Sequence, residues 1–305
     1  MNILVSGLLN IETTVSVDGF PVPYNPVNYK FFGINSNVSG VGFNLAKSLS
    51  TLGDTVSVIS FLGNDVEADI VLAQLKNDNI QSRIIRTLKK TPASVILYDP
   101  QGKRQIYCDL KNIQEQSVNP CDVETELNTC DIAVLCNINF NRRLLKSAKN
   151  KGITIATDVH VLSDINDDYN RDFMENADIL FLSDEGLPCD AADFIRQLYN
   201  RYHNKIIVIG MGSKGAMLFD SKTDEISVIP AYYAAKVVNT VGAGDSLFSS
   251  FLHFYAKYSD AKEALKRAVI FAGIKIGYNG ASLGFCTEDE IEKIIGNIYT
   301  PVSKF

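Results

Sequence analysis

Apolar residues along this chain follow two alternating spacings. Short runs rich in β-branched residues, typical of strands buried on both faces of a sheet, are separated by longer stretches of helical spacing. This succession is typical of a mostly parallel sheet flanked by helices, so the sequence predicts a doubly wound α/β core. Helices that each close on a glycine are predicted over residues 40–53 and 140–152. The predicted strands cover residues 2–7, 55–60, 132–136, 153–157, 178–182 and 206–210.

Two segments interrupt this rhythm. Residues 12–35 hold three of the nine prolines and a cluster of aromatic residues. Residues 92–110 alternate as a β-hairpin around Asp99-Pro100-Gln101-Gly102, where proline presets φ and glycine permits a positive φ. We predict that both segments form a small β-sheet projecting from the core, and we call them the lid; decorated surface loops are the other interpretation. The core then comprises residues 1–11, 36–91 and 111–305.

Composition narrows the class of partner. The 305-residue chain has a formal net charge of −6 and a pI near 5.2. Nucleic acids and anionic membranes need a basic surface, so we expect neither and favour small molecules. Six cysteines without a CxxC pair and only three histidines give no familiar zinc spacing. With no basic leader and no apolar run of membrane-spanning length, we expect a cytoplasmic protein.

The stretch "NTVGAGDSLFSSF" (239–251) places small residues and an acid where a helix begins. The unpaired amides at a helix N-terminus attract anions, and Gly242, Ala243 and Gly244 leave them accessible. Asp245 falls in the first turn, before an apolar stripe of helical spacing. Two interpretations fit these residues alone: an anion-binding turn with a functional carboxylate, or an acid that only caps the helix.

A second glycine-containing turn, "SGVGFN" (39–44), lies near the N-terminus. Gly40 and Gly42 let the backbone approach a ligand, while the amide of Asn44 offers a donor and an acceptor to paired hydroxyls. A strand-to-helix turn with a capping role is the alternative.

Together these motifs resemble the ribokinase-like (PfkB) carbohydrate kinase family. "NTVGAGD" is similar to its "DTxGAGD" signature and "SGVGFN" to its "GGxGxN" signature, in the family's order. "VIGMGSKGAMLF" (208–219) is similar to its "TLGxKGA" segment, and "GYNGAS" (277–282) to its late "xGA" loop. The resemblance covers essentially the whole chain. It implies phosphoryl transfer from ATP to a hydroxyl, with Asp245 as general base and the 242–245 backbone as anion hole.

The resemblance also implies substrate-binding and nucleotide-binding residues in the core. Gly40, Gly42 and Asn44 match the acceptor signature. Glu12 stands where the family has an acid that grips substrate hydroxyls; Asn10 is an alternative, and a surface glutamate is a third interpretation. The residues that match the nucleotide segments are Gly212, Ser213, Lys214, Gly215, Asn279 and Gly280.

Three positions depart from the family's pattern. Asn239 replaces the first aspartate of the anion-hole signature, and Ser39 replaces the first glycine of the other. Ser183 stands at the asparagine of the family's "NxxE" motif, which supports Mg²⁺ through water. Because hard cations prefer charged oxygen ligands, we expect Mg²⁺ to depend on Glu185 or Asp184, with Asn239 a weakened contributor. The resemblance leaves a monovalent cation requirement open.

The acceptor is predicted to be unphosphorylated, because cationic side chains are scarce around the acceptor motifs. Residues 10–44 contain Lys30 as their one basic residue. Arg104 of the hairpin either points into the site or, as we expect, faces solvent on its strand. A sugar and a nucleoside both remain open, with a sugar favoured by the family. The aromatic residues of residues 12–35 fit stacking on a base, or packing of one lid on another in a homodimer. These residues are Tyr24, Tyr29, Phe31 and Phe32.

A binding protein without catalysis is a further hypothesis. The changes at Asn239 and Ser183 are compatible with a nucleotide or sugar sensor, since a fold does not guarantee its chemistry. Retention of Asp245 argues against a sensor, because a protein that only binds has little need of a base.

Overall fold

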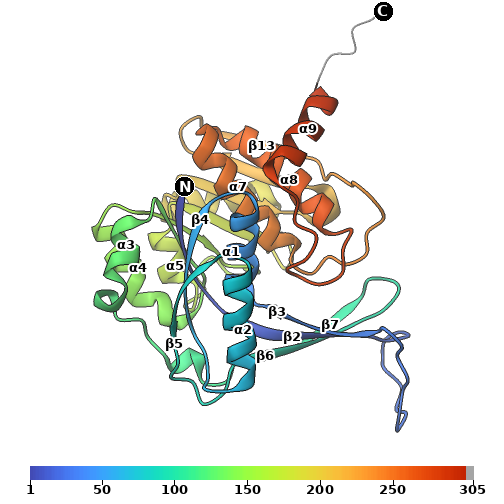
Figure 1. Cartoon of the computed structure of the whole chain (residues 1–305). Coiled ribbons are helices and arrows are strands. Elements are labelled where there is room, and N and C mark those ends of the chain that lie inside the picture. The colour runs from blue at the N-terminus through green and yellow to red at the C-terminus, as the bar shows by residue number, and fades with distance from the viewer. Residues whose placement is uncertain (300–305) are drawn as a thin grey trace, which may run out of the picture.

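The computed structural model describes residues 1–299, and within them the predicted core is built on a nine-stranded sheet (Figure 1). The strand order is β13-β12-β11-β10-β9-β8-β1-β4-β5. All pairs from β11 to β5 are parallel, and β12 and β13 add an antiparallel edge. The strands are β1 (Asn2–Ser6), β4 (Thr55–Phe61), β5 (Gln81–Ile85), β8 (Ile132–Leu135), β9 (Thr154–Asp158), β10 (Ile179–Ser183), β11 (Ile206–Gly210), β12 (Ala216–Asp220) and β13 (Glu225–Ile229).

The predicted strands are confirmed to within one or two residues at their ends. Their apolar runs are buried on both faces, as a parallel sheet covered by helices requires. Three strands of this sheet, β5, β12 and β13, were not predicted. β5 is a polar edge strand, while β12 and β13 are joined by a short turn and pair outside any βαβ unit.

Helices cover both faces of the sheet, which confirms the doubly wound fold (Figure 1). On one face α1, α7 and α8 pack together, and on the other α4, α5 and α6 contact β8, β9, β11 and β12. None of the helices in the described part of the chain is both long and apolar enough to cross a membrane. The helices are α1 (Val41–Thr51), α2 (Val66–Asn77), α3 (Glu124–Thr129), α4 (Arg142–Asn150), α5 (Arg171–Asn176), α6 (Ala191–Tyr202), α7 (Ala243–Tyr258), α8 (Ala261–Lys275) and α9 (Glu288–Tyr299). Short 3₁₀ turns are η1 (Ile113–Glu115), η2 (Pro120–Val123), η3 (Asn139–Asn141) and η4 (Gly212–Lys214).

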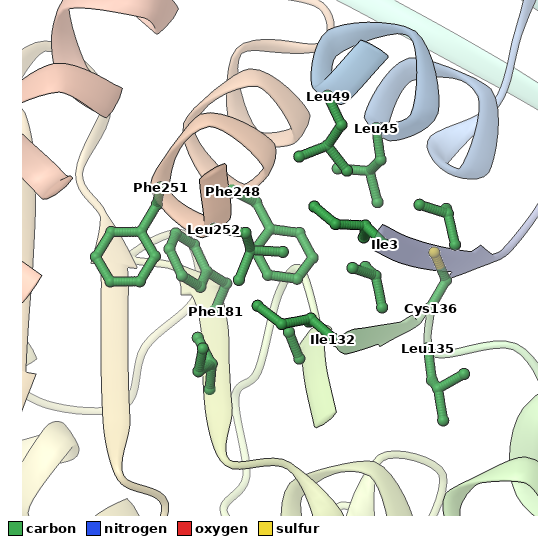
Figure 2. Close-up of a cluster of buried hydrophobic side chains, with 14 of the residues drawn as sticks. Ile3, Leu45, Leu49, Ile132, Leu135, Cys136, Phe181, Phe248, Phe251 and Leu252 are labelled. Carbon is green, nitrogen blue, oxygen red and sulfur yellow. The ribbon is translucent and has the colours of Figure 1, made fainter. Parts of the chain in front are cut away.

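The core that positions α7 is aromatic (Figure 2). Phe181 of β10 packs against Phe248 and Phe251 of α7, with ring centroids 4.7 and 5.2 Å apart. Each fully buried ring of this kind stabilises the fold by about 1.5–3 kcal/mol, so the contact fixes the start of α7 beside the carboxyl end of β10. The same cluster includes Ile3, Leu45, Leu49, Ile132 and Leu252.

A second, four-stranded sheet projects from the core in the order β3-β2-β6-β7 (Figure 1). Its strands β6 (Ala93–Tyr98) and β7 (Arg104–Asp109) form the predicted antiparallel hairpin, and β6 also pairs in parallel with β2 (Asn10–Ser16). β2 pairs antiparallel with β3 (Ile34–Ser39). This small sheet begins before residue 12 and continues beyond residue 35, so the strands reach closer to the core than the range predicted for the lid.

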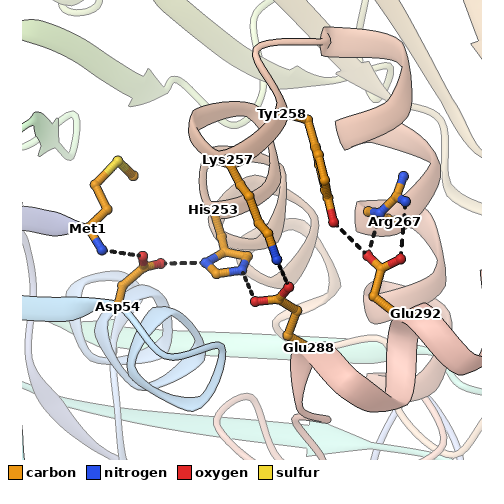
Figure 3. Close-up of polar contacts among 8 residues, drawn as sticks. All are labelled: Met1, Asp54, His253, Lys257, Tyr258, Arg267, Glu288 and Glu292. Carbon is orange, nitrogen blue, oxygen red and sulfur yellow. Dashed lines mark hydrogen bonds and ion pairs between the residues drawn. The ribbon is translucent and has the colours of Figure 1, made fainter.

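Polar contacts connect the C-terminal helix α9 to its neighbours (Figure 3). Buried His253 of α7 lies between Asp54 and Glu288, with its Nδ1 2.8 Å from one carboxylate and its Nε2 3.2 Å from the other. Arg267 of α8 donates through Nε to Glu292 Oε1 at 2.7 Å. These contacts lie at the opposite end of α7 from Asp245, and they hold α7, α8 and α9 together.

Candidate active site

The turn before α7 depends on Gly242. This residue is the N-cap of the helix with φ 77°, in the left-handed region, and a Cβ there would lie 2.6 Å from the carbonyl oxygen of Ala281. No side chain caps the helix, and its first intrahelical bond runs from the Ser246 amide to the Gly242 carbonyl at 2.9 Å. The amides of Gly244 and Asp245 precede that bond, as expected for an anion-binding helix N-terminus.

Asp245 is held in place from α1. Asn44 Nδ2 donates to Asp245 Oδ2 at 2.7 Å, and the two helices are further joined by a 2.7 Å contact between the hydroxyls of Ser48 and Ser249. Burial raises the pKa of Asp245, although the Asn44 bond opposes the shift. A carboxylate with a raised pKa is a stronger base than an ordinary aspartate.

Polar contacts continue from Asn44 into the small sheet. The hydroxyl of Ser39 lies 3.3 Å from Asn44 Oδ1 and 3.1 Å from Glu12 Oε2. Burial raises the pKa of Glu12, while the Ser39 hydroxyl and the Ala281 amide partly counter the rise. Asn10 lies two residues along β2 on the same face, donates to Ser94 Oγ at 3.1 Å, and keeps Oδ1 buried without a partner in the structure. We call Asn10, Glu12, Ser39, Asn44 and Ser94 the acceptor-side group.

Gly40 and Gly42 pack against the backbone of residues 7–10. Gly40 has φ 97°, and a Cβ there would lie 2.5 Å from the carbonyl oxygen of Leu8. A Cβ on Gly42 would lie 2.7 Å from the carbonyl carbon of Gly7. The structure thus explains these two glycines by the close packing of α1 on the segment between β1 and β2, which in turn positions Asn44.

A cavity of about 940 Å³ opens on the other side of the turn. Ala243 and Gly244 line it, together with Gly212, Ser213 and Gly215 around η4. It lies at the carboxyl ends of β9, β10 and β11, where ligands bind in open α/β sheets. Asp245 connects the two regions, because it directly follows cavity-lining Gly244 and is bonded to Asn44 of the acceptor-side group.

Three of the predicted nucleotide residues do not line this cavity: Lys214, Asn279 and Gly280. Lys214 is exposed at the end of η4. Asn279 accepts a bond from Asn239 Nδ2 at 3.0 Å and approaches the Tyr98 hydroxyl at 3.4 Å. Ala281 of the 277–282 loop packs against Gly242, and Ser282 of the same loop donates to the Val38 carbonyl of the small sheet at 3.0 Å.

The predicted metal ligands separate into two places. Asp184 and Glu185 line the large cavity, as does Ser183. Asn239 caps the turn instead, because its Oδ1 accepts the Val241 amide at 2.8 Å and its Nδ2 binds Asn279. Residues 1–299 contain no group of three or more His, Cys, Asp or Glu side chains that could enclose a metal. One or two carboxylates beside a phosphate-sized space nevertheless fit Mg²⁺, which usually keeps waters and substrate phosphates as its other ligands.

Several charged residues of the site were missed by the sequence reasoning. Asp158 and His160 line the cavity. Burial lowers the pKa of His160, but the Asp158 carboxylate has the larger combined effect and raises this pKa to about 9. Arg104 is exposed, as expected, but it also lines the cavity and donates from Nη1 to Thr240 Oγ1 at 3.1 Å. Lys275 is fully buried behind the turn. Two local signals existed: Asp158 ends a buried strand, and Lys275 is a lone cation in the apolar run "AVIFAGIKIG".

Comparison with known proteins agrees with this arrangement. Residues 1–288 match the model of the pfkB family carbohydrate kinases. The chain is 24% identical to a ribokinase of Dictyostelium discoideum over 95% of this chain and 99% of that protein. A microbiome-derived acarbose kinase superposes with a TM-score of 0.88 at 22% identity, over 97% of this chain and 98% of that one. A putative ribokinase II from E. coli, in complex with ATP and Mg²⁺, superposes with a TM-score of 0.79 at 19% identity, over 97% and 99%.

The match to the family model spans both tightly packed turns, Gly40 to Asn44 and Gly242 to Asp245. This chain therefore belongs to the pfkB family of carbohydrate kinases.

Proposed function

We propose that this protein transfers the γ-phosphoryl group of ATP to a hydroxyl of an unphosphorylated sugar. One observation carries the proposal: Asp245 directly follows Gly244, which lines a large cavity, and it is bonded to Asn44 of the polar group that contains Glu12. A base between a nucleotide site and an acceptor site is what direct transfer requires. The complex of the E. coli relative with ATP and Mg²⁺ supports the choice of nucleotide and metal.

In the proposed reaction, Asp245 accepts the proton of the acceptor hydroxyl as its oxygen attacks the γ-phosphorus. The new O–P bond forms while the bond from that phosphorus to the β-phosphate oxygen breaks, and ADP leaves with the electron pair. The amides at the start of α7 stabilise charge on the transferring group. Asp184 and Glu185 would hold Mg²⁺, which neutralises phosphate charge when bound. Arg104 reaches the same turn and adds positive charge.

The acceptor-side group favours a neutral polyhydroxylated acceptor. Glu12 supplies hydrogen-bond acceptors, and the amides of Asn10 and Asn44 supply donors and acceptors. The carboxylate of Glu12 would repel a phosphate on the acceptor, which supports an unphosphorylated substrate. The names of the relatives, ribokinase and acarbose kinase, support a sugar.

A nucleoside is the second candidate acceptor. The segment between β2 and β3 carries Tyr24, Tyr29, Phe31 and Phe32, whose exposed fractions run from 80% to 100%. Rings this exposed are available to stack on a base. A non-catalytic sensor is less well supported, because the raised pKa of Asp245 suits a general base.

The function is tested with a panel of acceptors. Ribose, fructose, adenosine, inosine, cytidine and pseudouridine are each incubated with ATP and Mg²⁺, and ADP release is measured. We expect turnover with a sugar and none when a chelator exceeds Mg²⁺. Faster turnover of a nucleoside would transfer the assignment to the second candidate. Binding of ATP and acceptor without turnover would support the sensor.

The substitution Glu12→Gln tests the acceptor side. Losing hydrogen bonds to a charged group costs about 1.5–3 kcal/mol, so kcat/KM for the acceptor should fall about 10- to 150-fold while KM for ATP stays unchanged. Steady-state kinetics with each substrate varied separately measure both values. The exposed Glu225→Gln on β13 is the matched control and should leave both constants unchanged. An unaltered acceptor kcat/KM in Glu12→Gln would mean that Glu12 has only a structural role.

We further propose that two copies associate through the lid in the cytoplasm. The same exposed aromatic segment and the edge strand β3 give a second lid an apolar surface and unpaired backbone groups to bind. All six cysteines are unpaired, which supports a reducing compartment.

A further inference from the structure

Lys275, the last residue of α8, is the most deeply buried charged side chain of the site, with no exposed surface. Its Nζ donates to the backbone carbonyl of Val241, in the turn that leads into α7. Burying an ammonium group is costly unless it is paired and hydrogen-bonded. The charges that compensate are the carboxylates of Asp245 and Glu12, the two acids assigned to the reaction.

The contact between Lys275 and the Val241 carbonyl fixes the Val241–Gly242 peptide, where the anion hole begins. Val241 is held at both of its polar groups, since its amide donates to Asn239 Oδ1 at 2.8 Å and its carbonyl accepts from Lys275. The carbonyl of Val241 and the N–H of Gly242 belong to the same planar trans peptide and point in opposite directions. Anchoring the carbonyl on Lys275 therefore orients the Gly242 amide away from Lys275.

The ammonium group also contributes charge. It lies behind a helix N-terminus that is already partly positive, in an interior where charges are weakly screened. A potassium ion beside the same carbonyl would carry the same single positive charge and, like the ammonium group, would bind the carbonyl oxygen. A free monovalent cation at this carbonyl would be repelled by the ammonium group that already contacts it.

Resting on the proposed kinase function, we propose that the Lys275 side chain is a built-in monovalent cation of the anion hole. It positions the Val241–Gly242 peptide and supplies fixed positive charge to the phosphoryl site, so the enzyme needs no added K⁺ or Na⁺. Lys275 is a positioning residue in this role, because it acts through the turn.

The ionisation of Lys275 gives the proposal a pH signature. Burial lowers the pKa of Lys275 to about 8, with Arg104 of β7 adding to the fall and Asp245 of α7 and Glu12 of β2 opposing it. The ammonium form is thus present below about pH 8 and lost above it, so kcat should decline as the pH rises through that value. Conversely, the charge of Lys275 lowers the pKa of Asp245, so removing it should shift the acidic limb of kcat/KM to higher pH.

The test compares wild type, Lys275→Met and Lys262→Met, an exposed lysine on the same helix. ADP release is measured in potassium, sodium and tetramethylammonium salts. We expect wild type and Lys262→Met to be equally active in all three. Lys275→Met should lose about 10²- to 10³-fold in kcat, the usual cost of a lost anion-hole donor, with little change in acceptor KM. Ammonium or K⁺ should restore part of the kcat of Lys275→Ala, because the smaller side chain leaves room for an ion.

Binding of ADP with aluminium fluoride, an analogue of the transferring phosphoryl group, is titrated in the same salts. This readout separates the two proposals, since it does not require turnover of any acceptor. The cation proposal is overturned if wild type needs K⁺ for tight analogue binding, or if folded Lys275→Met binds and turns over like wild type. Thermal unfolding checks the fold of each variant, and if the Lys275 variants do not fold, the wild-type salt series alone decides.

Discussion

Substituting Asp245 with asparagine is expected to lower kcat by about 10²- to 10⁴-fold, the usual contribution of a positioned general base. Asparagine has nearly the same shape and can still accept the bond from Asn44 Nδ2, so the turn should be preserved. The wild-type kcat/KM should fall as the pH drops through the pKa of Asp245, which burial raises above its ordinary value of 3.8. The variant should lack that acidic limb, and steady-state kinetics from acid to neutral pH measure both effects.

The chain offers a matched control for the alternative that Asp245 only caps its helix. Asp193 is the third residue of α6, as Asp245 is the third residue of α7, and it is exposed. Asp193→Asn should cost about 0.3–1 kcal/mol of stability through the helix dipole and leave kcat unchanged. If Asp245→Asn behaves in the same way, with kcat retained, then the capping interpretation is correct and Asp245 is not the base.

The second large effect is expected for Gly242→Ala. The new methyl group would meet the Ala281 carbonyl oxygen at 2.6 Å, and alanine is strained at a φ of 77°. The turn must move to relieve the contact, so the amides that follow lose their alignment. We expect a loss of about 10²- to 10³-fold in kcat and about 1–3 kcal/mol in the free energy of unfolding. Urea denaturation and steady-state kinetics measure the two quantities.

Gly152→Ala separates strain from function. Gly152 has a φ of 71° in the turn between α4 and β9, and a Cβ there would meet no atom within 4 Å. This control should cost about 1–2 kcal/mol for the left-handed conformation while kcat stays at the wild-type value. A Gly242→Ala enzyme as active as Gly152→Ala would show that the turn does not stabilise the transferring group.

The sequence predicted most parts of the fold that leave a local pattern, although the apolar run of β12 was missed. Strands such as β1 and β11 are buried on both faces and read as continuous apolar runs, so they were found. The edge strand β5 lacks that pattern because its burial is partial. The hairpin around Gly102 was found because its turn chemistry is local.

The candidate site divides in the same way. Gly242, Asp245 and Asn44 belong to motifs whose spacing is visible in the chain. The contacts of Lys275 with Val241 and of Arg104 with Thr240 join residues 34 and 136 positions apart, and no local spacing encodes such pairs. Gly40 and Gly42 were found, but their role could not be read from the sequence. A glycine that lets a ligand approach and a glycine that lets a neighbouring backbone approach look identical in sequence.

The residues of the candidate site are divided between the core and the small sheet, and this division has a consequence for how substrate preference changes. Asp245 and Asn44 sit on two helices joined through Ser48 and Ser249, whereas Asn10, Glu12, Ser39 and Ser94 are all carried by strands of the small sheet. If the proposed function holds, substitutions at these four positions would alter which alcohol is recognised while the contacts of Asp245 with Asn44 stay intact. Selection for a new substrate would then act on strands of the small sheet and leave the two helices unchanged.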